Sequence, residues 1–164
     1  MPVIATAPVV AVSHLDLERY AGTWHEIARL PMYFQRKCAT GVTATYTPRA
    51  DGTIGVHNQC VTAEGKTIAS DGVARRPEPF SQGKLEVRFA PAWLSWLPMV
   101  WAEYWVIALD ENYRWAMVGQ PSRKYLWILS RTPAMDRATF ESLKAKAVSM
   151  GYDLTPLVVS GKVD

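Results

Sequence analysis

The sequence predicts an all-β domain, an eight-stranded up-and-down antiparallel β-barrel with one C-terminal flanking α-helix. Eight segments with alternating apolar and polar residues follow one another along the chain, and turn residues separate them. A single stretch with helical spacing of its apolar residues comes after all of them. Eight strands joined in order close into a barrel with room for one small ligand.

One domain is expected over residues 15–160, after an N-terminal tail at 1–14. The tail is apolar but lacks the basic segment of a signal peptide. Connections such as "RADG", "AEG", "DEN" and "QPSR" carry the turn residues. The strands are expected at 22–30, 41–47, 53–60, 66–75, 84–90, 102–109, 113–119 and 124–131.

The helix is expected near 136–150. Asp136 is a good N-cap, and Gly151 follows the last turn as a natural C-terminal stop. Phe140, Leu143, Ala147 and Val148 repeat on one face. A lone amphipathic helix after eight strands buries that face against the outside of the barrel.

Composition and charge exclude several classes of function. The net charge is +3, but Lys and Arg are scattered and form no stripe, so no nucleic acid is expected as a partner. No apolar run approaches the roughly 18 residues that a membrane-spanning helix needs. The three histidines have no metal-ligand spacing, and no phosphate loop or serine elbow occurs. We therefore expect no catalytic residue, no metal and no cofactor, and a binding protein rather than an enzyme.

The two cysteines, Cys38 and Cys60, flank a predicted hairpin with its turn near 51–52. Antiparallel pairing places Val42 opposite Cys60, with Cys38 just beyond the strand. A disulfide fits this geometry and stabilises by about 3 kcal/mol in the loop-entropy model. It favours the periplasm or the exterior. The alternative is two unrelated thiols in a reducing cytosol.

Three motifs resemble the signatures of the lipocalin family, a member of the calycin group of barrels. They are "GTW" at 22–24, "ALDENY" at 108–113 and "WILSRTP" at 127–133. The resemblance covers 15 to about 157, and the phrases "GTWHEIARLP" and "YLWILSRTP" are most similar to the bacterial outer-membrane lipocalins and apolipoprotein D.

The resemblance implies structural roles for the signature residues. Trp24 on the first strand and Arg131 at the end of the last meet where the barrel closes, and a guanidinium over an indole contributes about 0.5 to 2 kcal/mol. An alternative role for Arg131 is binding a ligand carboxylate. The residues assigned to structure are Gly22, Trp24, Asp110, Tyr113 and Arg131.

The resemblance also implies a function, which is binding, storage or transport of a small lipid, a fatty acid or a lysophospholipid, at the bacterial cell envelope. The location is periplasm or outer membrane, or the protein is secreted. The bacterial relatives are often anchored through an N-terminal cysteine, but this sequence has none before Cys38.

Strand parity predicts which side chains face the cavity. Small residues at Gly72 and Ala74 are expected to leave room for a ligand, and Tyr46, Asn58 and Tyr104 are its sparse polar groups. The predicted ligand-binding residues are Ala44, Tyr46, Val56, Asn58, Leu85, Val87, Phe89, Tyr104, Val106, Trp127 and Leu129.

The stretch "PAWLSWLPMVW" at 91–101 contains two prolines and no charge. The prolines disfavour a helix or a central strand, so a loop at the mouth is expected. An apolar lip there contacts a membrane surface peripherally or pairs with a second copy as a homodimer; the alternative is a lid over the cavity. Its residues are Trp93, Leu94, Trp96, Leu97, Met99 and Trp101.

Two further functions remain open as alternatives. Glu26 is expected to point inward, and a buried carboxylate is either a satisfied structural group or an acid–base catalyst. A lipid-modifying, isomerase-like enzyme would use a cavity thiol, which requires Cys38 or Cys60 to be reduced. A membrane-surface interaction module would use the tryptophan-rich loop.

Overall fold

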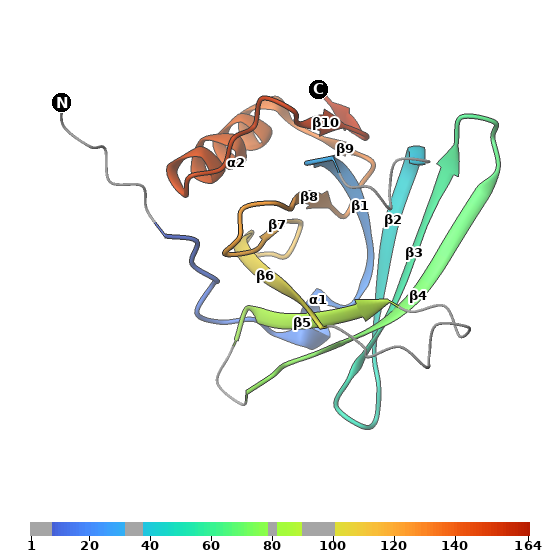
Figure 1. The fold of residues 1–164 in the computed structure, drawn as a ribbon, viewed down its shortest axis with the longest axis vertical. Coiled ribbons are helices and arrows are strands. Elements are labelled where there is room, and N and C mark those ends of the chain that lie inside the picture. The colour runs from blue at the N-terminus through green and yellow to red at the C-terminus, as the bar shows by residue number, and fades with distance from the viewer. Residues whose placement is uncertain (1–7, 32–37, 79–81, 90–100) are drawn as a thin grey trace.

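The computed structural model describes residues 8–31, 38–78, 82–89 and 101–164. It is a closed barrel with the longer of its two described helices on the outside (Figure 1). The barrel strands are β1 Gly22–Arg29, β2 Cys38–Pro48, β3 Ile54–Thr62, β4 Thr67–Arg75, β5 Lys84–Phe89, β6 Ala102–Leu109, β7 Trp115–Gly119 and β8 Leu126–Ser130. The helices are α1 Leu17–Tyr20 and α2 Arg137–Ser149, and the short strands are β9 Ala134–Met135, β10 Val158–Val159 and β11 Lys162–Val163.

Each barrel strand pairs antiparallel with the next one in the sequence, and β1 also pairs with β8. The closing pairs run from His25 opposite Ser130 to Arg29 opposite Trp127. Strand β10 adds to the other side of β1, opposite Ala28 and Arg29. The predicted eight-stranded up-and-down barrel with a C-terminal helix is therefore confirmed.

Three strand starts differ from the expected ones by two or three residues, and β3 and β4 begin one residue later than expected. Strand β2 begins at Cys38, earlier than expected, because Cys38 already pairs with Thr62. Strands β7 and β8 begin later, because the residues before them form turns. Tyr113, with φ of 56°, donates its N–H to the carbonyl of Asp110, and Arg123 adopts φ of 62°.

The predicted disulfide between Cys38 and Cys60 is confirmed, with 5.5 Å between the Cα atoms. The register is irregular here: Thr40 pairs with Val61 and Thr43 pairs with Gln59. Residues 41–42 therefore lie across from the single residue Cys60, which places Val42 where the hairpin predicted it. The bridge links the first residue of β2 to β3.

Helix α2 packs against the outside of the barrel, as expected. The carboxylate of Asp136 accepts the N–H of Thr139, which caps the first turn. Phe140, Leu143 and Ala147 are the buried residues of its inner face. Val148, which was expected on the same face, is 56% exposed instead, because it lies one position beyond Ala147 around the helix. The buried residues join an outer core that includes Ile27, Ile107, Met117 and Ile128 from the strands.

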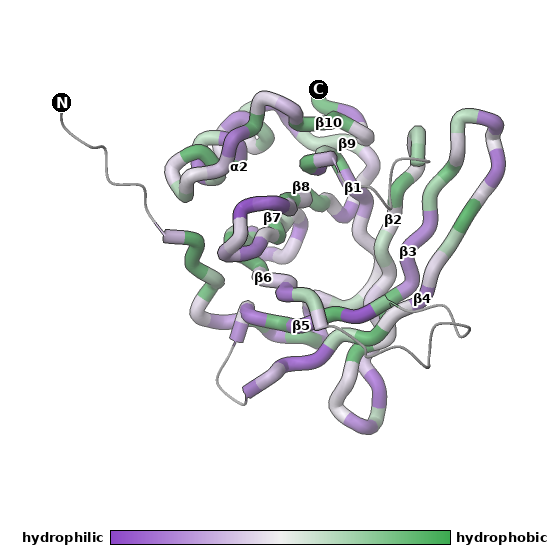
Figure 2. Tube along the Cα trace, viewed as in Figure 1, coloured by the Kyte–Doolittle hydropathy of each residue, from purple (hydrophilic) through white to green (hydrophobic). Residues whose placement is uncertain are grey.

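A second core fills one end of the barrel interior. Its members include Leu15, Trp24, Val106 and Val118. Figure 2 shows hydrophobic and hydrophilic residues following one another along the strands, as expected where one face is buried and the other meets water.

The segment before α1 also contacts the barrel. Val9 is buried, and the backbone of Val12 pairs with the carbonyl of Val106 and the N–H of Gly83. No helix of the described residues is long and apolar enough to cross a membrane.

Candidate ligand-binding cavity

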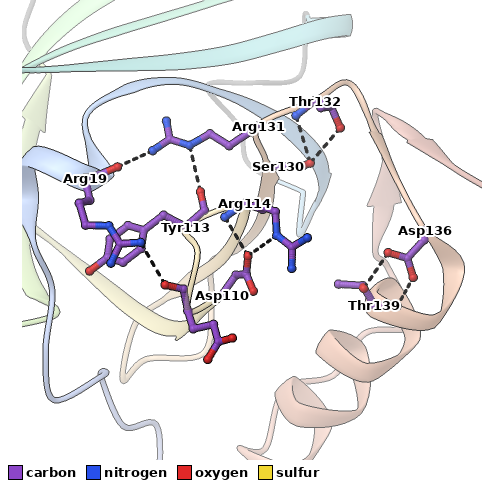
Figure 3. Close-up of polar contacts among 10 residues, drawn as sticks. Arg19, Asp110, Tyr113, Arg114, Ser130, Arg131, Thr132, Asp136 and Thr139 are labelled. Atoms are coloured by element: carbon purple, nitrogen blue, oxygen red, sulfur yellow. Dashed lines mark hydrogen bonds and ion pairs between the residues drawn. The ribbon is translucent and has the colours of Figure 1, made fainter.

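Arg131 and Trp24 close one end of the barrel. Figure 3 shows Arg131 with its hydrogen bonds to the carbonyls of Arg19 and Tyr113. The guanidinium carbon of Arg131 lies 3.8 Å from the centroid of the Trp24 ring. Its three nitrogens donate to backbone carbonyls of Arg19, Ala21, Thr23 and Tyr113 at 2.7 to 3.3 Å. Trp24 is fully buried and donates its indole N–H to the carbonyl of Tyr20. One side chain thus joins α1, β1 and the β6–β7 turn.

The other signature residues lie at the same end. Asp110 accepts the backbone N–H and the side-chain Nε of Arg114, and these hydrogen bonds lower the pKa of the Asp110 carboxyl. The Tyr113 hydroxyl accepts the N–H of Asp16. Gly22 has φ of 102°, and an added Cβ would lie 3.3 Å from Arg131. The structure brings all five predicted structural residues together, and none of them is among the described residues that line the barrel cavity.

The opposite end opens into a cavity of about 640 Å³, which lies between the walls of the barrel. Its lining is mainly apolar, and the charged residues that line it are Glu26, Arg88 and Glu103. Of the predicted ligand-binding residues, those that line it are Ala44, Tyr46, Val56, Asn58, Leu85, Val87, Phe89, Tyr104, Trp127 and Leu129. Val106 is fully buried in the inner core instead and does not line it.

Gly72 does not leave the room for a ligand that its size suggested. A Cβ added there would lie 2.6 Å from the carbonyl of Arg88 and 2.6 Å from the Phe89 ring. The missing side chain therefore lets β5 approach β4 and lets Phe89 cover the strand. Ala74, two residues further on, does line the cavity.

The strand-parity prediction missed several residues that line the cavity. Leu17 and Tyr20 reach the cavity from α1, and a four-residue helix is too short to show a period. Ser70 could have been found by continuing the parity of Ala74 and Gly72 along β4. The other lining residues that the prediction omitted are Cys38, Val42, Thr43, Ile54, Gln59, Cys60, Ile68, Ala69, Arg88, Ala102, Glu103, Val118, Gln120 and Tyr125.

Three tyrosines from different elements meet inside the cavity. The hydroxyl of Tyr104 on β6 lies 2.6 Å from that of Tyr20 on α1 and 2.8 Å from that of Tyr46 on β2. Burial raises the pKa of Tyr46 to about 12, and it raises the pKa values of Tyr20 and Tyr104 well above their usual range. All three hydroxyls therefore keep their protons at neutral pH.

Glu26 is buried at the cavity wall, where its carboxylate has an ion-pair partner and a hydrogen-bond donor. Arg29 contacts its Oε2 at 2.7 Å, and the hydroxyl of Ser160 donates to the same oxygen at 2.6 Å. These partners support the structural interpretation of Glu26. The only unsatisfied side-chain acceptor in the described part of the cavity wall is the buried Oδ1 of Asn58.

At the mouth, Trp101 lies between two arginines. Its ring centroid is 3.8 Å from the guanidinium of Arg75 on β4 and 4.7 Å from that of Arg88 on β5. The rest of the predicted lip lies outside the described residues, namely Trp93, Leu94, Trp96, Leu97 and Met99. Trp101 therefore ties the end of that stretch to the barrel wall. Among the described residues, no cluster of His, Cys, Asp or Glu is placed to hold a metal ion.

Comparison with known proteins matches the chain to a family model, to relatives of similar sequence and to solved structures of the same fold. The model of a lipocalin-like domain matches residues 15–161. Temperature-induced lipocalin-1 of Arabidopsis thaliana is 45% identical over 148 residues, which cover 89% of this chain and 78% of that one. The outer membrane lipoprotein Blc of Escherichia coli is 37% identical over 92% of this chain and 81% of its own. Insecticyanin from Manduca sexta superposes with a TM-score of 0.72 at 24% identity, covering 95% of this chain and 85% of its own.

Proposed function

Because the chain belongs to the lipocalin family, we propose that it binds one small hydrophobic or amphiphilic lipid inside the barrel, and stores or carries it. The lipid class is a fatty acid or a lysophospholipid. The observation that carries the proposal is the cavity of about 640 Å³, which opens at one end and is lined mainly by apolar side chains. Volumes of about 300 to 1,000 Å³ are typical of small-molecule sites.

The geometry supports a ligand with one buried chain and one exposed end. Each methylene that leaves water contributes about 0.8 kcal/mol before ordering costs, which is roughly a fourfold gain in affinity. Carbon chains contact the walls, and a charged headgroup remains in water at the mouth. The roles of the lining residues in binding are part of this proposal.

The proposed location is the cell envelope, either the periplasm or the outer membrane, or outside the cell. The name of the bacterial relative, an outer membrane lipoprotein, supports this, and so does the disulfide, because such bridges persist in oxidising compartments. Fractionation of the host cell followed by immunodetection tests the location. Recovery in a reducing cytosol would contradict it.

Two alternatives receive less support. The isomerase-like enzyme needs a cavity thiol, but both cysteines are joined in the disulfide. Peripheral membrane contact or a homodimer through the mouth loop rests on residues 91–101, of which the structure describes Trp101 alone. Serine at positions 93, 96 and 97 should lower vesicle binding or dissociate a dimer if that loop has either role. If vesicle binding, association state and lipid uptake are all unchanged, the loop has neither the membrane role nor the dimer role.

The deciding experiment is a chain-length series with a blocked cavity as the control. Displacement of a fluorescent fatty acid by saturated acids should give affinity that rises with chain length until the cavity is full. Ala44→Phe places a larger side chain inside the cavity and should lower affinity about 16- to 64-fold, since it displaces two or three methylenes at roughly fourfold each. Thr47→Phe adds the same ring on an exposed position of the same strand and should not. Equal affinity for all chain lengths would contradict burial in the barrel.

A further inference from the structure

The tyrosine cluster at the inner end of the cavity contains more hydrogen-bond donors than its own bonds use. Tyr20, Tyr46 and Tyr104 come from α1, β2 and β6, and all three line the cavity. Each is at most 9% exposed. Tyr104 lies in the middle, with the other two hydroxyls at 2.6 Å and 2.8 Å.

The three tyrosine hydroxyls have one more hydrogen to donate than the two hydrogen bonds between them use. Each phenol hydroxyl has one hydrogen to donate and two lone pairs that accept. Two hydrogen bonds join the three hydroxyls, and within the described residues none of these hydroxyls makes another. Whichever way the two bonds run, one of the three hydrogens has no acceptor in this part of the chain. A buried polar group without a partner is unfavourable, so this hydrogen favours an acceptor on a ligand.

The position of the cluster is deep in the cavity. Tyr46 pairs with Gly22, the first residue of β1, and the ring of Tyr20 lies 5.0 Å from that of Trp24, which closes the barrel. The disulfide, by contrast, lies at the other end of β2. A lipid whose charged end stays at the mouth therefore presents its far end to the tyrosines.

The surrounding charges select an uncharged oxygen. The charged residues on the described cavity wall are Glu26, Arg88 and Glu103. Glu26 forms an ion pair with Arg29, and Arg88 lies over the ring of Trp101. Arg131 lies against Trp24 and is not part of the lining. The charge of Arg131 reaches Tyr20, but its nitrogens donate to backbone carbonyls. A carboxylate at the tyrosines would therefore lose its hydration without a cation to hydrogen-bond, which is costly. A hydroxyl or a carbonyl accepts the free hydrogen at no such cost, and a hydroxyl can also donate to the spare lone pairs.

We propose that Tyr20, Tyr46 and Tyr104 form a deep subsite that receives an uncharged oxygen at the inner end of the ligand. The ligand class is then a lipid with polar groups at both ends, such as an ω-hydroxy or ω-keto fatty acid. The raised pKa values support this, because the cluster stays a neutral donor over the physiological range. This inference rests on the proposed binding of a lipid in the barrel.

The test compares palmitic acid with ω-hydroxypalmitic acid in two proteins, by displacement of a fluorescent fatty acid. The variant Tyr20→Phe/Tyr46→Phe/Tyr104→Phe keeps the ring shapes and removes all three hydroxyls together, so no partner remains unpaired. It should keep or raise the affinity for palmitic acid. Its affinity for the ω-hydroxy acid should fall at least fivefold relative to palmitic acid, the effect of one lost hydrogen bond.

The matched control is Thr45→Val, which removes a hydroxyl from the same strand as Tyr46 but outside the cavity lining. It should leave the ratio of the two affinities unchanged. A ratio that changes less than twofold in the triple variant overturns the subsite while the lipid-binding function stands. Failure of the native protein to bind either acid overturns the proposed function itself.

A second measurement covers the case in which the triple variant does not fold. In the native protein, proton nuclear magnetic resonance of slowly exchanging tyrosine hydroxyls should show a shift on addition of ω-hydroxypalmitic acid that palmitic acid does not cause. Identical spectra with the two saturating ligands overturn the subsite.

Discussion

At the closed end of the barrel polar groups bind one another, whereas towards the mouth apolar side chains line an open cavity. Arg131 joins three segments through four carbonyls, and Asp110 and Tyr113 fix the turn beside it. The cavity walls receive residues from every barrel strand, and the polar groups among them include the tyrosine cluster and Asn58. The two ends therefore have different roles: the closed end stabilises the barrel, and the cavity has room for a ligand. Substitutions at the two ends should therefore affect different measurements.

The largest effect is expected from Arg131→Met at the closed end. Four hydrogen bonds to carbonyls and the stacking on Trp24 are lost, so the free energy of unfolding should fall by about 4 kcal/mol, at about 1 kcal/mol for each hydrogen bond. Urea unfolding followed by tryptophan fluorescence measures it. Fatty-acid affinity of the folded variant should hardly change.

Arg114→Met provides the control at the same end. Its guanidinium is mostly exposed and contacts only Asp110 among the described side chains, so less than about 1 kcal/mol should be lost. If Arg131→Met lowers affinity as strongly as stability, the two ends are not separate in function.

The disulfide tests the stability of the mouth. Cys38→Ser/Cys60→Ser opens a loop with a sequence separation of 22 residues, and the loop-entropy model gives a loss of about 3 kcal/mol. Urea unfolding should give the double variant the same free energy of unfolding as the native protein treated with dithiothreitol. A variant as stable as the oxidised protein would show that the closed end alone holds the barrel together.

The smallest effect is a pH dependence at the closed end. The pKa of Asp110 is lowered in the folded state, chiefly by the Arg114 hydrogen bonds. Its stabilisation is therefore present above about pH 4, the unfolded pKa, and is lost as the pH falls through the folded pKa. Asp110→Asn should cost about 1 kcal/mol at pH 7. The gap between native and variant should shrink below about pH 4, and a gap that grows in acid would contradict the sign.

The sequence by itself determined the strand order and the helix, and it predicted the disulfide against the alternative of two free thiols. Alternation and turn residues are local properties, so eight strands and their connections can be identified without a structure. The pairing of Cys38 with Cys60 followed from one hairpin, in which the turn sets the register. The meeting of Trp24 with Arg131 was predicted from the resemblance of the first and the last motif to the lipocalin signatures.

Only the tertiary structure decided which inward residues reach open space. Val106 and Tyr104 share a face of β6, yet the inner core surrounds Val106 and leaves Tyr104 at the cavity. Gly72 makes room for Phe89 rather than for a ligand. Tyr20 enters the cavity from a helix too short to have a detectable period. Parity tells which face a side chain is on, but depth in the barrel depends on strand tilt and on what packs from elsewhere in the chain, so it is a property of the closed fold.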